Sequence, residues 1–90
     1  MHIVEDKDRL LARTRRIGGQ IAAVERQLTG EADCSQTLQL VASVRGAVDG
    51  LMNELMEQHM RAHVARPGLS DEERSAAAEE MLALIRRYRS

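Results

Sequence analysis

The chain has 90 residues, 43% of them apolar, and a formal net charge of −1, so we expect one small domain without the overall charge bias that would indicate a nucleic-acid partner. No apolar run approaches the roughly 20 residues needed to span a bilayer, so we expect no membrane-spanning helix and no membrane partner. The N-terminus lacks the charged-then-apolar pattern of a secretory signal. Because the sequence contains no Trp, no Phe and one Tyr, its core must come from aliphatic and Met side chains, and so modest a core favours oligomerisation.

The sequence predicts an all-α fold, a three-helix protomer that forms a single helical domain over residues 1–90. The only proline is Pro67, and no segment shows the alternation typical of a half-buried strand. The first helix is expected at about 5–28, followed by Gly30 in a left-handed cap position. Its apolar residues recur at helical spacing: Leu10, Ile17, Ile21, Val24 and Leu28.

Positive charge is concentrated on this first helix. From Arg9 to Arg16 there are four arginines and no acid, and Arg9, Arg13 and Arg16 share one helical face. A solvated charged face is the more common explanation, but such stripes from several chains could together bind DNA phosphates. Aromatic stacking residues are missing, which disfavours single-stranded nucleic acid. Arg45, farther along the chain, either joins this surface or pairs with an acid.

The second predicted helix is the longest, at about 33–64, with a length of roughly 45 Å. Its apolar positions form a wide face: Leu38, Val41, Val44, Val48, Leu51 and Leu55. Cys34, the only cysteine, lies at its start and cannot form an internal disulfide, which favours a reducing cytoplasm. His59 and His63 lie near its end at i, i+4, a spacing that places two imidazoles side by side.

These residues predict a metal site shared between two chains. Cys34 lies 25 positions before His59, roughly 37 Å along one helix, so the two cannot meet within that helix. In an antiparallel helical-bundle dimer, Cys34 of one chain would lie beside His59 and His63 of the other, and twofold symmetry would create two such sites. The short connection between the first two helices brings His2 toward the same end. Taken singly, the histidines are more often surface polar residues, and a free cysteine is more often a small buried hydrophobe. Together they form a ligand set suited to Ni(II), Co(II), Zn(II) or copper.

The third helix is expected at about 70–88. Arg66-Pro67-Gly68 ends the long helix, and Ser70 and Glu73 have the spacing of a capping box. Ala77, Met81, Leu84 and Ile85 are expected to face inward. The chain has no nucleophile elbow, phosphate-binding loop or paired carboxylates, so we do not expect an enzyme.

Several stretches give the chain a specific resemblance to a known family. It resembles the CsoR/RcnR family of metal- and formaldehyde-sensing transcriptional repressors, over a region from about His2 to Val64. The matching pieces are Arg13-Thr14-Arg15-Arg16-Ile17-Gly18-Gly19-Gln20, Cys34, Val44-Arg45-Gly46-Ala47-Val48-Asp49-Gly50-Leu51-Met52, and His59 with His63.

The resemblance implies a dimer that pairs into a disc-like tetramer. Such a protein binds double-stranded operator DNA and represses an efflux or detoxification operon until an inducer weakens its DNA affinity. Family DNA contacts are attributed to basic residues of the first helix. Arg13 and Arg16 match those positions, and Lys7, Arg9, Arg15 and Arg45 are further candidates.

The resemblance also bears on the inducer. The copper-sensing branch has a cysteine where this chain has His63, which argues against copper. The nickel/cobalt branch has a set matched by His2, Cys34, His59 and His63, so Ni(II) or Co(II) is the expected inducer, with Zn(II) possible in vitro.

Two alternatives to this assignment stand beside it. One is a formaldehyde-responsive repressor in which Cys34 is the reactive thiol, although the formaldehyde branch uses an N-terminal proline amine and this chain has His2. The other is a helical interaction module with neither a small ligand nor a DNA partner.

Overall fold

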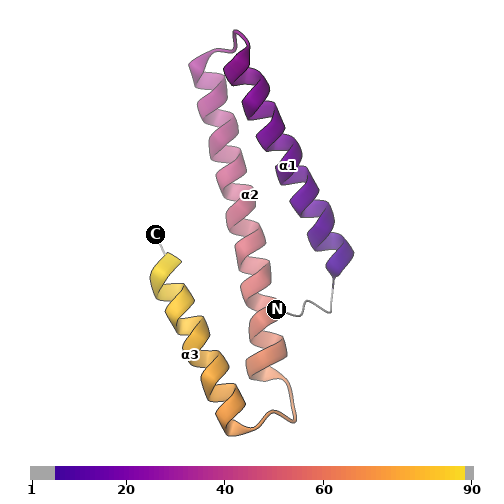
Figure 1. Cartoon of the computed structure of the whole chain (residues 1–90), viewed down its shortest axis with the longest axis vertical. Helices are drawn as coiled ribbons and strands as arrows, with labels where there is room; N and C mark the ends of the chain where they lie inside the picture. The colour runs from indigo at the N-terminus through magenta and orange to yellow at the C-terminus, as the bar shows by residue number, and fades with distance from the viewer. Residues whose placement is uncertain (1–5, 89–90) are drawn as a thin grey trace. The chain divides into compact units, whose positions relative to one another are not determined.

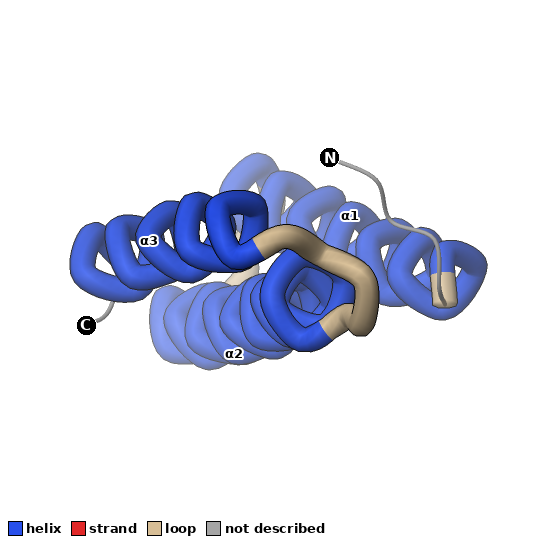
Figure 2. The backbone as a smooth tube through the Cα atoms, turned by 90° about the horizontal axis from the view of Figure 1, so that it is seen from below, coloured by secondary structure: helices blue, strands red, loops and turns tan. Residues whose placement is uncertain are grey.

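In the computed structural model, which describes residues 6–88, the chain forms three α-helices and one π-helical turn. Helix α1 spans Lys7–Thr29, α2 spans Cys34–Met60, η1 spans Arg61–Ala65 and α3 spans Asp71–Tyr88 (Figure 1). Loops connect the helices, and the described residues contain no strand (Figure 2). The predicted all-α, three-helix fold is therefore confirmed.

The described chain divides into two compact units, and α2 contributes to both. We call the part up to Asn53 the N-terminal unit and the part from Glu54 onward the C-terminal unit. No helix in residues 6–88 has the length and apolar character that crossing a membrane would require.

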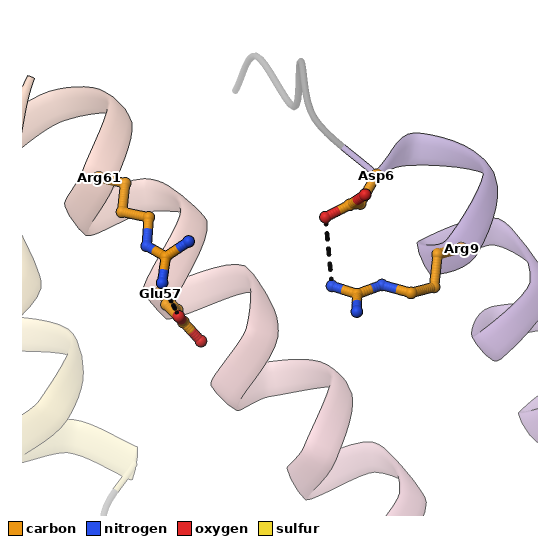
Figure 3. Close-up of polar contacts among 4 residues, drawn as sticks. All are labelled: Asp6, Arg9, Glu57 and Arg61. Atoms are coloured by element: carbon orange, nitrogen blue, oxygen red, sulfur yellow. Dashed lines mark hydrogen bonds and ion pairs between the residues drawn. The ribbon is translucent and has the colours of Figure 1, made fainter.

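Helix α1 begins and ends with different backbone conformations. Asp6 precedes it with φ 56° and ψ 30°, and its carboxylate pairs with Arg9 at 3.3 Å (Figure 3). At the other end the amide of Gly30 donates to the carbonyl of Arg26 at 3.0 Å. Gly30 then adopts φ −102° and ψ −157°, so the predicted left-handed cap is wrong. Its amide completes the last helical hydrogen bond, and the chain leaves α1 in an extended conformation.

In the N-terminal unit, α1 lies antiparallel beside the first part of α2 (Figure 1). The Thr37 hydroxyl donates to Gln27 Oε1 at 2.9 Å and joins the two helices near their connection. Leu10 and Val44 are buried. Much of the apolar surface remains uncovered within one chain, including Ile21, Leu28, Leu38, Val41 and Val48. This exposure is typical of a protomer that buries these residues against other chains.

In the C-terminal unit, η1 packs against α3. The predicted capping box is present: the Glu73 amide donates to Ser70 Oγ at 3.1 Å, and the Ser70 amide donates to Glu73 Oε1 at 3.2 Å. Met81 is only 2% exposed, in agreement with the predicted inward face. Leu84 and Ile85 are 38% and 41% exposed, so that part of the prediction is wrong for a single chain, in which residues 6–88 leave both side chains partly uncovered.

Candidate metal centre and DNA-binding surface

His59 and His63 are two metal-ligating side chains that lie next to each other. His59 lies in the last turn of α2 and His63 in η1, and their ring centroids are 4.6 Å apart with a 43° angle between the planes. Both residues are half-buried. Nε2 of His59 is buried and has no hydrogen-bond partner among the described residues. A buried polar atom without a hydrogen-bond partner is unfavourable. Coordination of a metal ion by Nε2 would remove this cost.

The turn that carries His63 differs from the regular helix predicted for residues 33–64. The α-helix ends at Met60, and Arg61–Ala65 winds as a π-helix. Single π-turns are rare and occur frequently at functional sites. Arg74 of α3 binds two backbone carbonyls at the end of this segment. Arg74 Nε donates to the carbonyl of Val64 at 2.7 Å, and Nη2 donates to that of Arg66 at 3.2 Å.

Cys34 is the first residue of α2, and its thiol is free and exposed. It belongs to the N-terminal unit, whereas the two histidines belong to the C-terminal unit. Within one chain, residues 6–88 contain no group of three His, Cys, Asp or Glu side chains that could hold a metal ion. His2, the remaining predicted ligand, lies outside the described residues. A single chain thus presents an imidazole pair, and further ligands would have to be added to it. The pair fits a borderline-soft metal ion, since imidazole nitrogen is a ligand that nickel, cobalt, zinc and copper all accept.

The predicted DNA-binding residues are mostly exposed on α1. Lys7, Arg9, Arg15 and Arg16 are exposed there, and Arg45 is exposed on α2. Arg13 differs from them because it is half-buried. Its guanidinium lies against α2 at Gly50, in the space that a β-carbon at this position would occupy. The α1 stripe therefore contains one arginine whose position depends on α2.

An open apolar hollow of about 390 Å³ lies between the end of α2 and α3 in the C-terminal unit. Met56, Met60, Met81 and Ile85 line it, together with Glu57 and Arg61. The last two form an exposed ion pair along the helix (Figure 3). Such exposed pairs contribute little to stability. The hollow adds to the apolar surface that a single chain leaves open.

Two residues next to these sites have contacts that the sequence does not predict. Arg74 contacts carbonyls eight and ten positions earlier, across a turn, and no spacing rule predicts such contacts. In the sequence, Gly50 belongs to the stretch of residues 44–52 that resembles the family. Only the structure shows that Arg13 fills the space beside this glycine.

Comparison with known proteins gives a consistent result. A family model described as metal-sensitive transcriptional repressor matches residues 6–87. The chain is 42% identical over 87 residues to an uncharacterized protein in the bioA 5′ region of Serratia marcescens, covering 97% of this chain and 96% of that protein. It is 41% identical over 67 residues to the transcriptional repressor RcnR of Salmonella arizonae, covering 74% of each.

A solved structure agrees with these matches. A glutamate-to-histidine variant of the formaldehyde-responsive regulator FrmR from Salmonella enterica serovar Typhimurium superimposes with a TM-score of 0.89 at 40% identity, covering 99% of this chain and 100% of that one. The matched family consists of transcriptional regulators, which confirms that the chain is not an enzyme and does not support a module without a DNA partner. The chain belongs to the metal-sensitive transcriptional repressors of the CsoR/RcnR family.

Proposed function

We propose that this chain represses a metal efflux or detoxification operon and is released from its operator when Ni(II) or Co(II) binds. The observation that carries the proposal is the imidazole pair, with rings 4.6 Å apart and a buried His59 Nε2 that has no hydrogen-bond partner in residues 6–88. A nitrogen held in this way is available to a metal ion. Similarity to a transcriptional repressor named RcnR supports the same assignment.

The proposed site is shared between two chains of an antiparallel dimer. Cys34 of one protomer would join His2, His59 and His63 of its partner, giving three nitrogen ligands and one thiolate. This set suits Ni(II) and Co(II), and Zn(II) would fit it in vitro. The exposed apolar residues of α2, such as Val41 and Val48, supply the surface that a dimer would bury. Two dimers then pair into a tetramer.

The DNA-binding surface of the proposal is the basic stripe of α1 formed by Arg9, Arg13 and Arg16, with Lys7, Arg15 and Arg45 as further contacts. Its contacts would be to phosphates, so its affinity for double-stranded operator DNA would fall steeply with salt. The inducer acts only if it binds the released state more tightly than the DNA-bound state. Binding of His2 at the end of the long helix would shift the start of α1, and with it the basic stripe.

A second candidate function is a formaldehyde-responsive repressor. The exposed, free thiol of Cys34 favours it, and so does the similarity to a formaldehyde-responsive regulator. In this reaction the thiol sulfur would bond to the aldehyde carbon, and the carbonyl oxygen would take up the thiol proton. The protein would gain the mass of one formaldehyde at Cys34.

Titration of the thiol-reduced protein with Ni(II) and Co(II), followed by absorbance, tests the proposal. A thiolate-to-metal charge-transfer band, together with loss of operator binding at the same metal equivalents, is the expected result. The second candidate would be selected if neither metal changes operator binding, while formaldehyde abolishes it and adds mass at Cys34.

A further inference from the structure

Arg74 connects the first turn of α3 to the turn that carries His63. Its Nε donates to the carbonyl of Val64 at 2.7 Å, and its Nη2 donates to the carbonyl of Arg66 at 3.2 Å. Val64 directly follows His63, so one side chain fixes the backbone on the C-terminal side of this histidine. All of these residues lie in the C-terminal unit.

The carbonyls that Arg74 binds need donors from outside the helix. The last carbonyls of a helix have no partner within it, and Pro67, which follows Arg66, has no backbone N–H to offer. The guanidinium supplies several donors in a fixed planar arrangement, so one side chain can bind two carbonyls. Its positive charge is also favourable at the C-terminal end of a helix.

Arg74 is itself held in place by the start of α3. Its backbone amide donates to the carbonyl of Ser70 at 3.0 Å. Ser70 and Glu73 lock this turn through their reciprocal hydrogen bonds. Arg74 is half-buried, whereas the arginine at 86, farther along α3, is exposed. The Arg74 side chain, which binds the end of the π-turn, thus projects from a first turn of α3 that is held by its own hydrogen bonds.

We infer that Arg74 is a positioning residue for His63, which keeps the π-turn wound and the two imidazoles together. This inference rests on the proposed function, because it gives a residue of α3 a role at the inducer site although α3 supplies no metal ligand. If Arg74 is removed, the carbonyls of Val64 and Arg66 lose their donors and η1 unwinds toward solvent. His63 then loses its place beside His59, and the pair no longer binds a metal ion as one unit.

The test uses the full chain with Arg74→Gln, which removes the charge and the planar donor group. Arg86→Gln is the matched control, since it removes the same group from an exposed position of the same helix. Arg74→Lys keeps the positive charge but lacks the planar set of N–H donors. It replaces Arg74→Gln in both measurements if Arg74→Gln does not fold. Two readouts are taken: Co(II) affinity from absorbance titration, and hydrogen exchange of the backbone amides of residues 63–65 in metal-free protein.

The expected result is a loss of Co(II) affinity of about 10- to 100-fold in Arg74→Gln, as for other residues that orient metal ligands. Amides of residues 63–65 exchange faster in the same variant, while those of α1 do not change, and Arg86→Gln behaves like the unsubstituted chain. Equal losses of affinity in both glutamine variants would overturn the inference, because a general charge effect would explain them.

Hydrogen exchange separates this inference from the proposed function. If the unsubstituted chain binds no Co(II), the proposed metal site fails, and faster exchange in Arg74→Gln still supports the role of Arg74 in holding His63. Unchanged exchange at residues 63–65 in Arg74→Gln would overturn that role, whatever the metal titration shows.

Discussion

The guanidinium of Arg13 in α1 lies against α2 at Gly50, where any β-carbon would collide with it. A collision with the far end of a flexible side chain is relieved by moving that side chain, so Gly50→Ala displaces Arg13 and leaves the helices in place. If Arg13 contacts DNA from its present position, Gly50→Ala weakens operator binding, measured by fluorescence anisotropy.

Gly46 provides the control for this prediction. It lies one turn earlier on α2, and a β-carbon there would meet no atom within 4 Å. Both alanine variants should gain helix propensity of up to about 1 kcal/mol, and sedimentation should show the same assembly for both. Equal operator affinities for Gly46→Ala and Gly50→Ala would show that the position of Arg13 does not affect DNA binding.

The exposed arginines of α1 make a separate prediction about salt. Arg16→Ala should lower the slope of log affinity against log salt concentration by about 0.9 for each DNA phosphate that Arg16 neutralises. Affinities for operator and unrelated DNA should fall together, since phosphate contacts carry no sequence information. Anisotropy titrations at several salt concentrations give the slope. An Arg16→Ala slope identical to that of the unsubstituted chain would remove Arg16 from the interface.

Release from DNA is predicted to need both halves of the shared site. Cys34→Ala and His63→Ala should each bind operator as the unsubstituted chain does, yet neither should be released by Ni(II) at concentrations that release the unsubstituted chain. Each substitution leaves too few ligands for tight binding. A Cys34→Ala variant that is released by Ni(II) as readily as the unsubstituted chain would contradict the proposed ligand set.

The start of α3 is predicted to lose stability in acid. Hydrogen bonds from the backbone amide of Ser70, and then from its hydroxyl, hold the pKa of Glu73 below its usual 4.5, with a smaller effect from the charge of Arg66. Because the folded pKa is lowered, this contribution to stability is present above pH 4.5 and is lost as the pH falls through the folded value.

Glu73→Gln tests this acid dependence. The variant should show a smaller drop in melting temperature than the unsubstituted chain when the pH is lowered from neutral to below 4.5. Glu72, an exposed acid in the same turn, provides the control as Glu72→Gln. Parallel melting profiles for Glu73→Gln and the unsubstituted chain would contradict the assignment.

Local patterns in the sequence predict much of this fold. Apolar periodicity indicates three helices, and the Ser70 and Glu73 spacing predicts a capping box whose two hydrogen bonds are present. These features depend on residues within a turn or two of each other. The i, i+4 spacing of His59 and His63 likewise predicts an imidazole pair, and their rings lie 4.6 Å apart.

Features that depend on distant partners could not be predicted in the same way. The regular apolar pattern of residues 33–64 does not predict the π-turn at Arg61–Ala65. Arg74 reaches the carbonyl of Val64 from another helix, so the sequence of the turn does not reveal this contact. The half-buried position of Arg13 depends on an empty space at Gly50. Ile85 is exposed because the described part of the chain, residues 6–88, leaves this apolar surface uncovered.

The most direct test of the shared site is a mixed dimer of Cys34→Ala and His63→Ala protomers, formed by unfolding and refolding the two variants together. In such a dimer one site has lost both residues, while the other retains Cys34 of one chain and His63 of its partner. We predict that mixing restores the thiolate-to-Co(II) charge-transfer band to about a quarter of its full intensity for random pairing, although neither variant alone gives it. A mixture that shows no more of the band than the separate variants would contradict a site shared between chains.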